Sequence, residues 1–311
     1  MKLIAAFFQL IRWRNLLFII LTQYLFYYCV FNPLVKPDEY FPRHLLFILL
    51  VCSSIFIAGA GYIINDYFDL QIDAVNRPAK VVVDRIIRRR WAIIWHLVLS
   101  GAGIFLSLVV SWKTGSWIIV LANLLCVLLL WFYSTTFKKM TLSGNIIIAA
   151  LTAWVIIVVY FFAGAKFGIW VNIVLPFDAK RFFKLTVMYA GFAFVVSLVR
   201  EVIKDLEDME GDVRYNCKTM PITWGVPASK VFVAVWLIVC IGLLLIVQLY
   251  AWQSGWWTVV LYSILLIIFP LVYLLKKLRD AITPGDYHRL SGLVKFIMLT
   301  GILTMAFFAF Y

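Results

Sequence analysis

More than half of the acidic residues of this chain lie in two short segments that share one spacing. We call residues 65–73 the first acid segment and residues 205–212 the second acid segment. The acids at matching offsets are Asp66, Asp69 and Asp73 in the first segment and Asp205, Asp208 and Asp212 in the second. Offsets of 0, 3 and 7 residues place three carboxylates on one face of a helix. We therefore predict two matching acidic helix faces.

Carboxylates crowded in this way repel one another unless a multivalent cation lies between them. Hard oxygen ligands suit Mg²⁺, and Asn65 adds a neutral amide oxygen beside the first acids. If the two segments converge, their six carboxylates are enough to hold two Mg²⁺ ions bridged by a diphosphate. The predicted metal ligands are Asn65, Asp66, Asp69, Asp73, Asp205, Asp208 and Asp212.

Basic residues flank both acid segments, and Arg and Lys are the usual partners of phosphate oxygens. Together with Asn65, those predicted to contact the diphosphate are Arg77, Lys80, Lys138, Arg200 and Lys204. The clusters Arg88-Arg89-Arg90 and Lys276-Lys277 are interpreted as ordinary anchors at the membrane surface.

The rest of the composition is that of a membrane protein. Of 311 residues 65% are hydrophobic, and the mean hydropathy is +0.99. Apolar runs long enough to cross a bilayer as helices occur at 15–31, 43–64, 91–111, 115–134, 145–163, 185–204, 228–250, 255–276 and 291–310. We predict an all-α, multi-pass protein with about nine transmembrane helices, in which residues 1–311 form a single membrane domain.

The net charge of +13 could indicate nucleic-acid binding, but its distribution favours a membrane orientation. With nine crossings, 21 of the 28 Lys and Arg residues fall on the side of the N-terminus. The positive-inside rule then predicts a cytoplasmic N-terminus, both acid segments on the cytoplasmic side, and the C-terminus outside. No nucleic-acid partner is expected.

The matched acids also indicate an internal repeat, since Asp66 and Asp205 are 139 residues apart and each segment ends an apolar run. Such repeats commonly form a shared site where their halves meet. We predict about four helices in each half, with a ninth added.

The motifs together resemble those of the UbiA superfamily of intramembrane prenyltransferases, from about residue 10 to the end of the chain. The residues that carry the resemblance are Asn65-Asp66-x-x-Asp69-x-x-x-Asp73, Asn76-Arg77-Pro78, Tyr133 with Lys138, Gly144-Asn145, and Lys204-Asp205 through Gly211-Asp212. The sequence departs from the family pattern at Arg12-Trp13-Arg14-Asn15 and in the loop 79–85.

The resemblance implies nine helices around a central cavity with a cytoplasmic polar cap. It also implies Mg²⁺-dependent use of a prenyl diphosphate, and a hydrophobic or amphipathic acceptor that enters from the membrane lipid. The residues that the resemblance makes catalytic are Asp66, Asp69, Asp73, Asp208, Asp212 and Tyr133. Tyr67 is also expected near the site.

Residues 200–212, followed by Lys218-Thr219-Met220-Pro221-Ile222, are most similar to family members that alkylate geranylgeranylglyceryl phosphate. That acceptor is our first expectation. Within the class, the alternative is an aromatic acceptor of the 4-hydroxybenzoate, homogentisate or naphthoate type. A membrane transporter with a cytoplasmic cation site is the alternative from another class, although transporters usually place their acids near the bilayer midplane.

Overall fold

The computed structural model describes residues 2–35, 44–76, 78, 82–165 and 178–310, and these ranges fold into helices. The α-helices are α1 (Lys2–Leu10), α2 (Trp13–Leu25), α3 (His44–Phe68), α4 (Leu70–Asn76), α5 (Arg89–Thr114), α6 (Trp117–Thr135), α7 (Ser143–Ala165), α8 (Ala179–Glu207), α9 (Met209–Arg214), α10 (Met220–Thr223), α11 (Val226–Gln253), α12 (Trp257–Ser263), α13 (Phe269–Asp280) and α14 (Pro284–Leu303). The predicted all-α class is confirmed for this part of the chain.

Nine helical segments in the described ranges are long and apolar enough to cross a membrane. They are Trp13–Leu34, His44–Phe68, Arg89–Thr114, Trp117–Thr135, Ser143–Gly164, Ala179–Glu207, Val226–Gln253, Trp257–Asp280 and Pro284–Ala309. Two of these spans contain a π-helical turn, at Phe26–Phe31 and at Ile264–Ile268. The predicted multi-pass architecture agrees with this set of spans.

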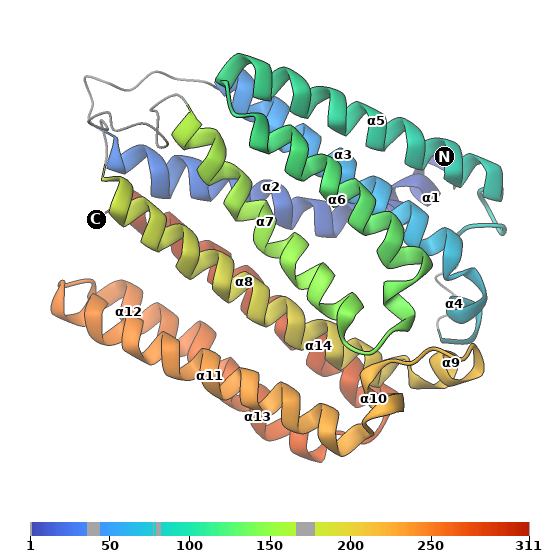
Figure 1. Cartoon of the computed structure of the whole chain (residues 1–311). Coiled ribbons are helices and arrows are strands. Elements are labelled where there is room, and N and C mark those ends of the chain that lie inside the picture. Colours follow the sequence, from blue (N-terminus) through green and yellow to red (C-terminus); the bar gives the residue numbers. More distant parts are fainter. Residues whose placement is uncertain (1, 36–43, 77, 79–81, 166–177, 311) are drawn as a thin grey trace.

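The long helices run roughly side by side (Figure 1). The chain begins at one end of this bundle and finishes at the other. α3 packs along α5 and α6, while α8 packs along α7, α11 and α14. Small residues allow the closest approaches. A Cβ added to Gly103 in α5 would lie 2.7 Å from Ile57 of α3, so only glycine fits at this crossing.

Buried polar side chains join the membrane helices away from the acid segments. The Oγ atoms of Ser53 and Ser107 lie 2.6 Å apart, and Asn123 Nδ2 donates to Ser107 Oγ at 2.7 Å. Trp154 Nε1 completes the chain by donating to Asn123 Oδ1 at 2.8 Å. Because such groups find no water in hydrocarbon, their mutual hydrogen bonds fix α3, α5, α6 and α7 relative to one another.

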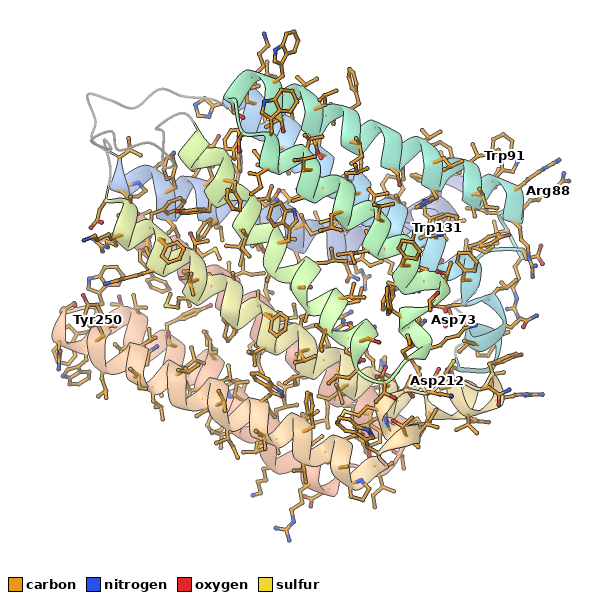
Figure 2. All side chains as sticks on the ribbon, viewed as in Figure 1. Asp73, Arg88, Trp91, Trp131, Asp212 and Tyr250 are labelled. Carbon is orange, nitrogen blue, oxygen red and sulfur yellow. The ribbon has the colours of Figure 1, made fainter. Side chains whose placement is uncertain are left out.

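The two ends of the bundle differ in chemistry. An aromatic cluster around Phe26, Phe47, Phe162 and Phe182 closes the end that holds the last residues of the chain. The short helices α4, α9 and α10 lie at the other end (Figure 1). Figure 2 shows Asp73 and Asp212 together at this second end, with Tyr250 at the aromatic end.

Candidate active site

Each acid segment is a helix that is interrupted at its middle acid. α3 ends at Phe68 and α4 begins at Leu70, so Asp69 lies at the junction. The same interruption falls at Asp208, between α8 and α9. The predicted single helix face is therefore wrong in this detail, because the third acid of each segment belongs to a separate short helix.

The backbone hydrogen bonds around the two interruptions correspond pair by pair. Asp69 N–H donates to Asn65 O at 2.9 Å, and Asp208 N–H donates to Lys204 O at 2.9 Å. One turn later, Asp73 N–H donates to Asp69 O at 2.8 Å, and Asp212 N–H donates to Asp208 O at 3.2 Å. The two acid segments thus share their local backbone hydrogen bonds at 139-residue spacing, while the wider repeat of about four helices in each half stays a prediction.

The two segments meet where α4 packs against α9. Asn76, the last residue of α4, donates from Nδ2 to Asp208 O at 3.0 Å and accepts at Oδ1 from Gly211 N–H at 2.8 Å. The two acid segments therefore converge at this end of the bundle, which is the condition for a shared metal site.

The first two acids of the first segment are each paired with a cation from another element. Arg12 Nη2 lies 2.7 Å from Asp66 Oδ1, because a left-handed backbone conformation at Arg12 (φ 51°) turns the chain between α1 and α2. Lys138, from the connection between α6 and α7, forms an ion pair with Asp69, whose side chain is only 5% exposed. Both cations thus neutralise carboxylates that would otherwise repel one another.

Lys138 lies among acids of both segments. Burial opposes the charged form of Lys138, but Asp69, Tyr133 and Asp73 together outweigh burial, and the pKa of Lys138 is raised as a result. Burial raises the pKa of Asp73 to about 6, and the negative charge of Asp69 adds to this effect. Burial also raises the pKa of Asp212 to about 6, although the charge of Lys138 opposes the rise. The acids of the site therefore have too little positive charge around them to balance their own charge. A divalent cation would supply the missing positive charge.

In the second segment, the hydrogen-bonded partners are different. Asn145 Nδ2 donates to Asp205 Oδ2 at 2.8 Å, so a neutral amide holds this acid. One turn earlier, Glu201 accepts from Arg200 Nη1 at 2.9 Å and from Lys204 Nζ at 2.9 Å. Arg200 Nε is buried without a hydrogen-bond partner. The two predicted phosphate ligands of this segment are thus bound to an acid outside the repeated motif.

The loop that carries Lys138 is fastened to the stretch that follows α9. Lys218 N–H donates to Lys139 O at 2.8 Å, and Thr141 Oγ1 donates to Lys218 O at 2.8 Å. This connection thus reaches the first acid segment through the Lys138 side chain, and it reaches the stretch after α9 through Lys139 O and Thr141 Oγ1.

In the described part of the chain, no three His, Cys, Asp or Glu side chains lie close enough together to hold a metal ion. The donor set nevertheless fits Mg²⁺. Asn65 Nδ2 donates to Asp69 Oδ2 at 2.6 Å, while Asn65 Oδ1 is buried without a hydrogen-bond partner. A buried carbonyl oxygen beside carboxylates is a hard ligand that a cation would satisfy.

Of the other predicted site residues, Arg77 and Lys80 lie outside the described residues. Tyr133 lies close enough to Lys138 for its oxygen to contribute to the raised pKa of that lysine, which supports the expected location of Tyr133. Tyr67 packs against an apolar cluster formed by α1, α3 and residues 82–92, and its expected place near the site stays a prediction.

Four residues that contact the acid segments or their cations are not predicted by the sequence: Arg12, Asn76, Asn145 and Glu201. Asn76 and Asn145 do belong to motifs quoted above, so their positions carried a signal. Arg12 was noted only as a departure from the family pattern, and it is 54 residues from its partner Asp66. No periodicity connects residues so far apart along the chain.

The model of the UbiA prenyltransferase family matches residues 9–290. The chain therefore belongs to this family of membrane prenyltransferases, and the predicted resemblance is confirmed.

Curated relatives include digeranylgeranylglyceryl phosphate synthases of two archaea. The protein of Methanothermobacter thermautotrophicus is 32% identical over 194 residues, which span 62% of this chain and 61% of that protein. The protein of Methanosphaera stadtmanae is 28% identical over 262 residues, which span 83% of this chain and 86% of that protein.

Solved structures share the fold over nearly the whole chain. A structure from work on digeranylgeranylglyceryl phosphate synthase in membranes has a TM-score of 0.59 at 22% identity, covering 98% of this chain and 99% of that chain. A UbiA homologue from Archaeoglobus fulgidus, bound to GPP and Mg²⁺, has a TM-score of 0.58 at 16% identity, covering 97% of this chain and 99% of that chain. At these identities the likeness establishes the fold, and the predicted nine-helix architecture agrees with it.

Proposed function

We propose that this protein transfers a prenyl group from a polyprenyl diphosphate to geranylgeranylglyceryl phosphate, in a reaction that depends on Mg²⁺. The observation that carries the proposal is the meeting of two matched acid segments at one end of an apolar bundle. The names of the curated relatives and the Mg²⁺–GPP complex of a homologue support the same reaction class.

The acids are proposed to hold two Mg²⁺ ions, with Asn65 Oδ1 as a further ligand. The metal ions, when bound, neutralise the diphosphate so that it can leave the allylic carbon. Lys138 and Arg12 each hold one acid of the first segment. As the acids bind metal, these side chains become available to contact phosphate oxygens.

The surrounding helices have a second role, which is to keep water away. A prenyl group that loses its diphosphate develops positive charge, and water would quench it to an alcohol. The apolar walls are proposed to exclude water, and the ring of Tyr133, whose hydroxyl influences Lys138, is proposed to stabilise the developing cation. A central cavity between the helices is proposed to hold both lipid substrates.

The excess of Lys and Arg on the side of the N-terminus supports a cytoplasmic location for the site and the N-terminus. It also suits an acceptor that carries a phosphate group. Residues 1–311 are proposed to act as one domain, because elements from both halves contribute side chains to the site.

Mass spectrometry of reaction products tests the proposal. The purified protein would receive Mg²⁺, geranylgeranyl diphosphate and four acceptors: geranylgeranylglyceryl phosphate, 4-hydroxybenzoate, homogentisate and dihydroxynaphthoate. We expect an adduct of the glyceryl phosphate that disappears when EDTA replaces Mg²⁺. An adduct of an aromatic acceptor alone would refute the acceptor but keep the class. Absence of both adduct and diphosphate release, with donors of several chain lengths, would refute the class.

A further inference from the structure

The start of α9 is capped by a residue of the other half of the molecule. The first N–H groups of any helix lack a partner within that helix, and an Asp at the N-cap position usually accepts from one of them. Asp208 is the N-cap residue of α9, but its side chain makes no cap hydrogen bond to this helix. Gly211 N–H, at the third position of α9, is instead bound by Asn76 Oδ1 at 2.8 Å.

Asn76 makes a second hydrogen bond to the same turn, from Nδ2 to Asp208 O at 3.0 Å. That carbonyl also accepts from Asp212 N–H at 3.2 Å, so the two amide atoms of Asn76 fix the backbone between the last two acids of the second segment. The 139-residue repeat provides no reciprocal contact, because Tyr215 occupies the position that corresponds to Asn76. Asn76, in the first half, therefore positions the first turn of α9 in the second half. The repeat does not duplicate this contact at the corresponding position.

The contact requires a residue without a side chain at position 211. A Cβ added to Gly211 would lie 2.6 Å from both Nδ2 and Oδ1 of Asn76, which is closer than real Cβ contacts. Glycine is otherwise unfavourable inside a helix. Its presence in α9 is explained by the close approach of the Asn76 amide.

We propose that Asn76 and Gly211 form a positioning clamp that takes over the capping of α9, so that the Asp208 carboxylate is directed to Mg²⁺–diphosphate. The inference rests on the proposed function, since that function assigns Asp208 to metal binding. Without the Asn76 amide, Gly211 N–H recruits the N-cap carboxylate of Asp208, as helix starts usually do. The acid is then withdrawn from the metal, while the protein still folds.

The test measures metal affinity directly, by electron paramagnetic resonance of Mn²⁺ added to the purified protein in lipid nanodiscs. For Asn76→Ala and for Gly211→Ala we expect Mn²⁺ affinity to fall by about 10- to 100-fold, the usual effect of losing a partner that orients a metal ligand. Melting temperatures without metal report on folding. Gly211→Ala provides the measurement from α9 if Asn76→Ala does not accumulate in the membrane.

The double variant separates a clamp from two unrelated defects. With Asn76→Ala present, an added Cβ at position 211 no longer meets the amide, so the double variant should match Asn76→Ala to within about twofold. The matched control is Gly242→Ala in α11, where an added Cβ meets nothing within 4 Å, and it should bind Mn²⁺ as the wild type does.

Unchanged Mn²⁺ affinity in Asn76→Ala, or losses that multiply in the double variant, would overturn the clamp and leave the proposed function intact. A fall in melting temperature alone would also overturn it, since a structural role predicts that result. No saturable Mn²⁺ binding by the wild type would overturn both proposals.

Discussion

The two acid segments have the same backbone but different partners. In the first segment, Asp66 and Asp69 are ion-paired with Arg12 and Lys138, which come from outside the acid segments. In the second segment, the neutral amide of Asn145 holds Asp205. Cations from other elements thus hold two acids of the first segment, where the Asn65 amide also donates to Asp69, whereas the Asn145 amide holds the first acid of the second segment.

This difference indicates that the partners of the two acid segments have different roles. Under the proposed function, Mg²⁺ displaces Arg12 and Lys138 from their acids, and the released cations bind phosphate. An amide donor stabilises a carboxylate without competing with a metal ion for its charge. On this basis, the first half should respond most strongly to changes of charge, and the second half to changes of geometry.

Asp69→Asn should have the largest effect. The substitution keeps the shape of the most buried acid of the first segment but removes its charge. Loss of several kcal/mol of transition-state stabilisation, as expected for a metal ligand, lowers the rate on the order of a thousandfold. Initial rates of product formation by mass spectrometry provide the measurement. Asp280→Asn, at the exposed end of α13, is the control and should react normally. Near-normal turnover of Asp69→Asn would refute the proposed metal site.

Lys138→Met and Arg12→Met should have the next largest effects. Comparison of the two variants shows which of these two cations contributes more to the reaction. Hydrogen bonds to charged groups contribute about 1.5–3 kcal/mol, so we expect a loss in kcat/KM of about 100-fold for Lys138→Met. Arg12→Met should lose only about tenfold, because Asp66 is more exposed (20%) than Asp69 (5%). Titration with prenyl diphosphate would measure both variants. The reverse order would show that Arg12 is the principal phosphate contact.

Asn145→Leu should have a smaller effect, in the second half. It removes the amide donor to Asp205 at similar volume, and a typical hydrogen bond from an uncharged donor contributes about 0.5–1.5 kcal/mol. We expect kcat/KM to fall by about threefold to tenfold. A loss as large as that of Lys138→Met would contradict the comparison, because the two halves would then depend equally on their partners.

His288→Ala should have the smallest effect. His288 Nδ1 lies 2.8 Å from Glu207 Oε1, but the histidine side chain is 63% exposed. Exposed ion pairs contribute little, so kcat/KM should change by less than about twofold. A tenfold loss would instead show that the first turns of α14 belong to the site.

The fold followed from the sequence because long apolar runs have few alternatives to membrane helices. The acids were found for a similar reason, since their spacing is local. The interruptions at Asp69 and Asp208 were missed because a helical period continues across them unchanged. Arg12 was missed because its contact depends on a left-handed backbone conformation that arginine rarely adopts.

The fastening of the Lys138 loop to Lys218 has a consequence for how the protein is made. Thr141 leaves the ribosome 77 residues before Lys218, its hydrogen-bonding partner. Until that later stretch has been synthesised, the loop is held to the acid segments by the Lys138–Asp69 ion pair but lacks its hydrogen bonds to Lys218. The two hydrogen bonds that fasten this loop to Lys218 therefore form only after the sixth span and the turn that follows it have been synthesised.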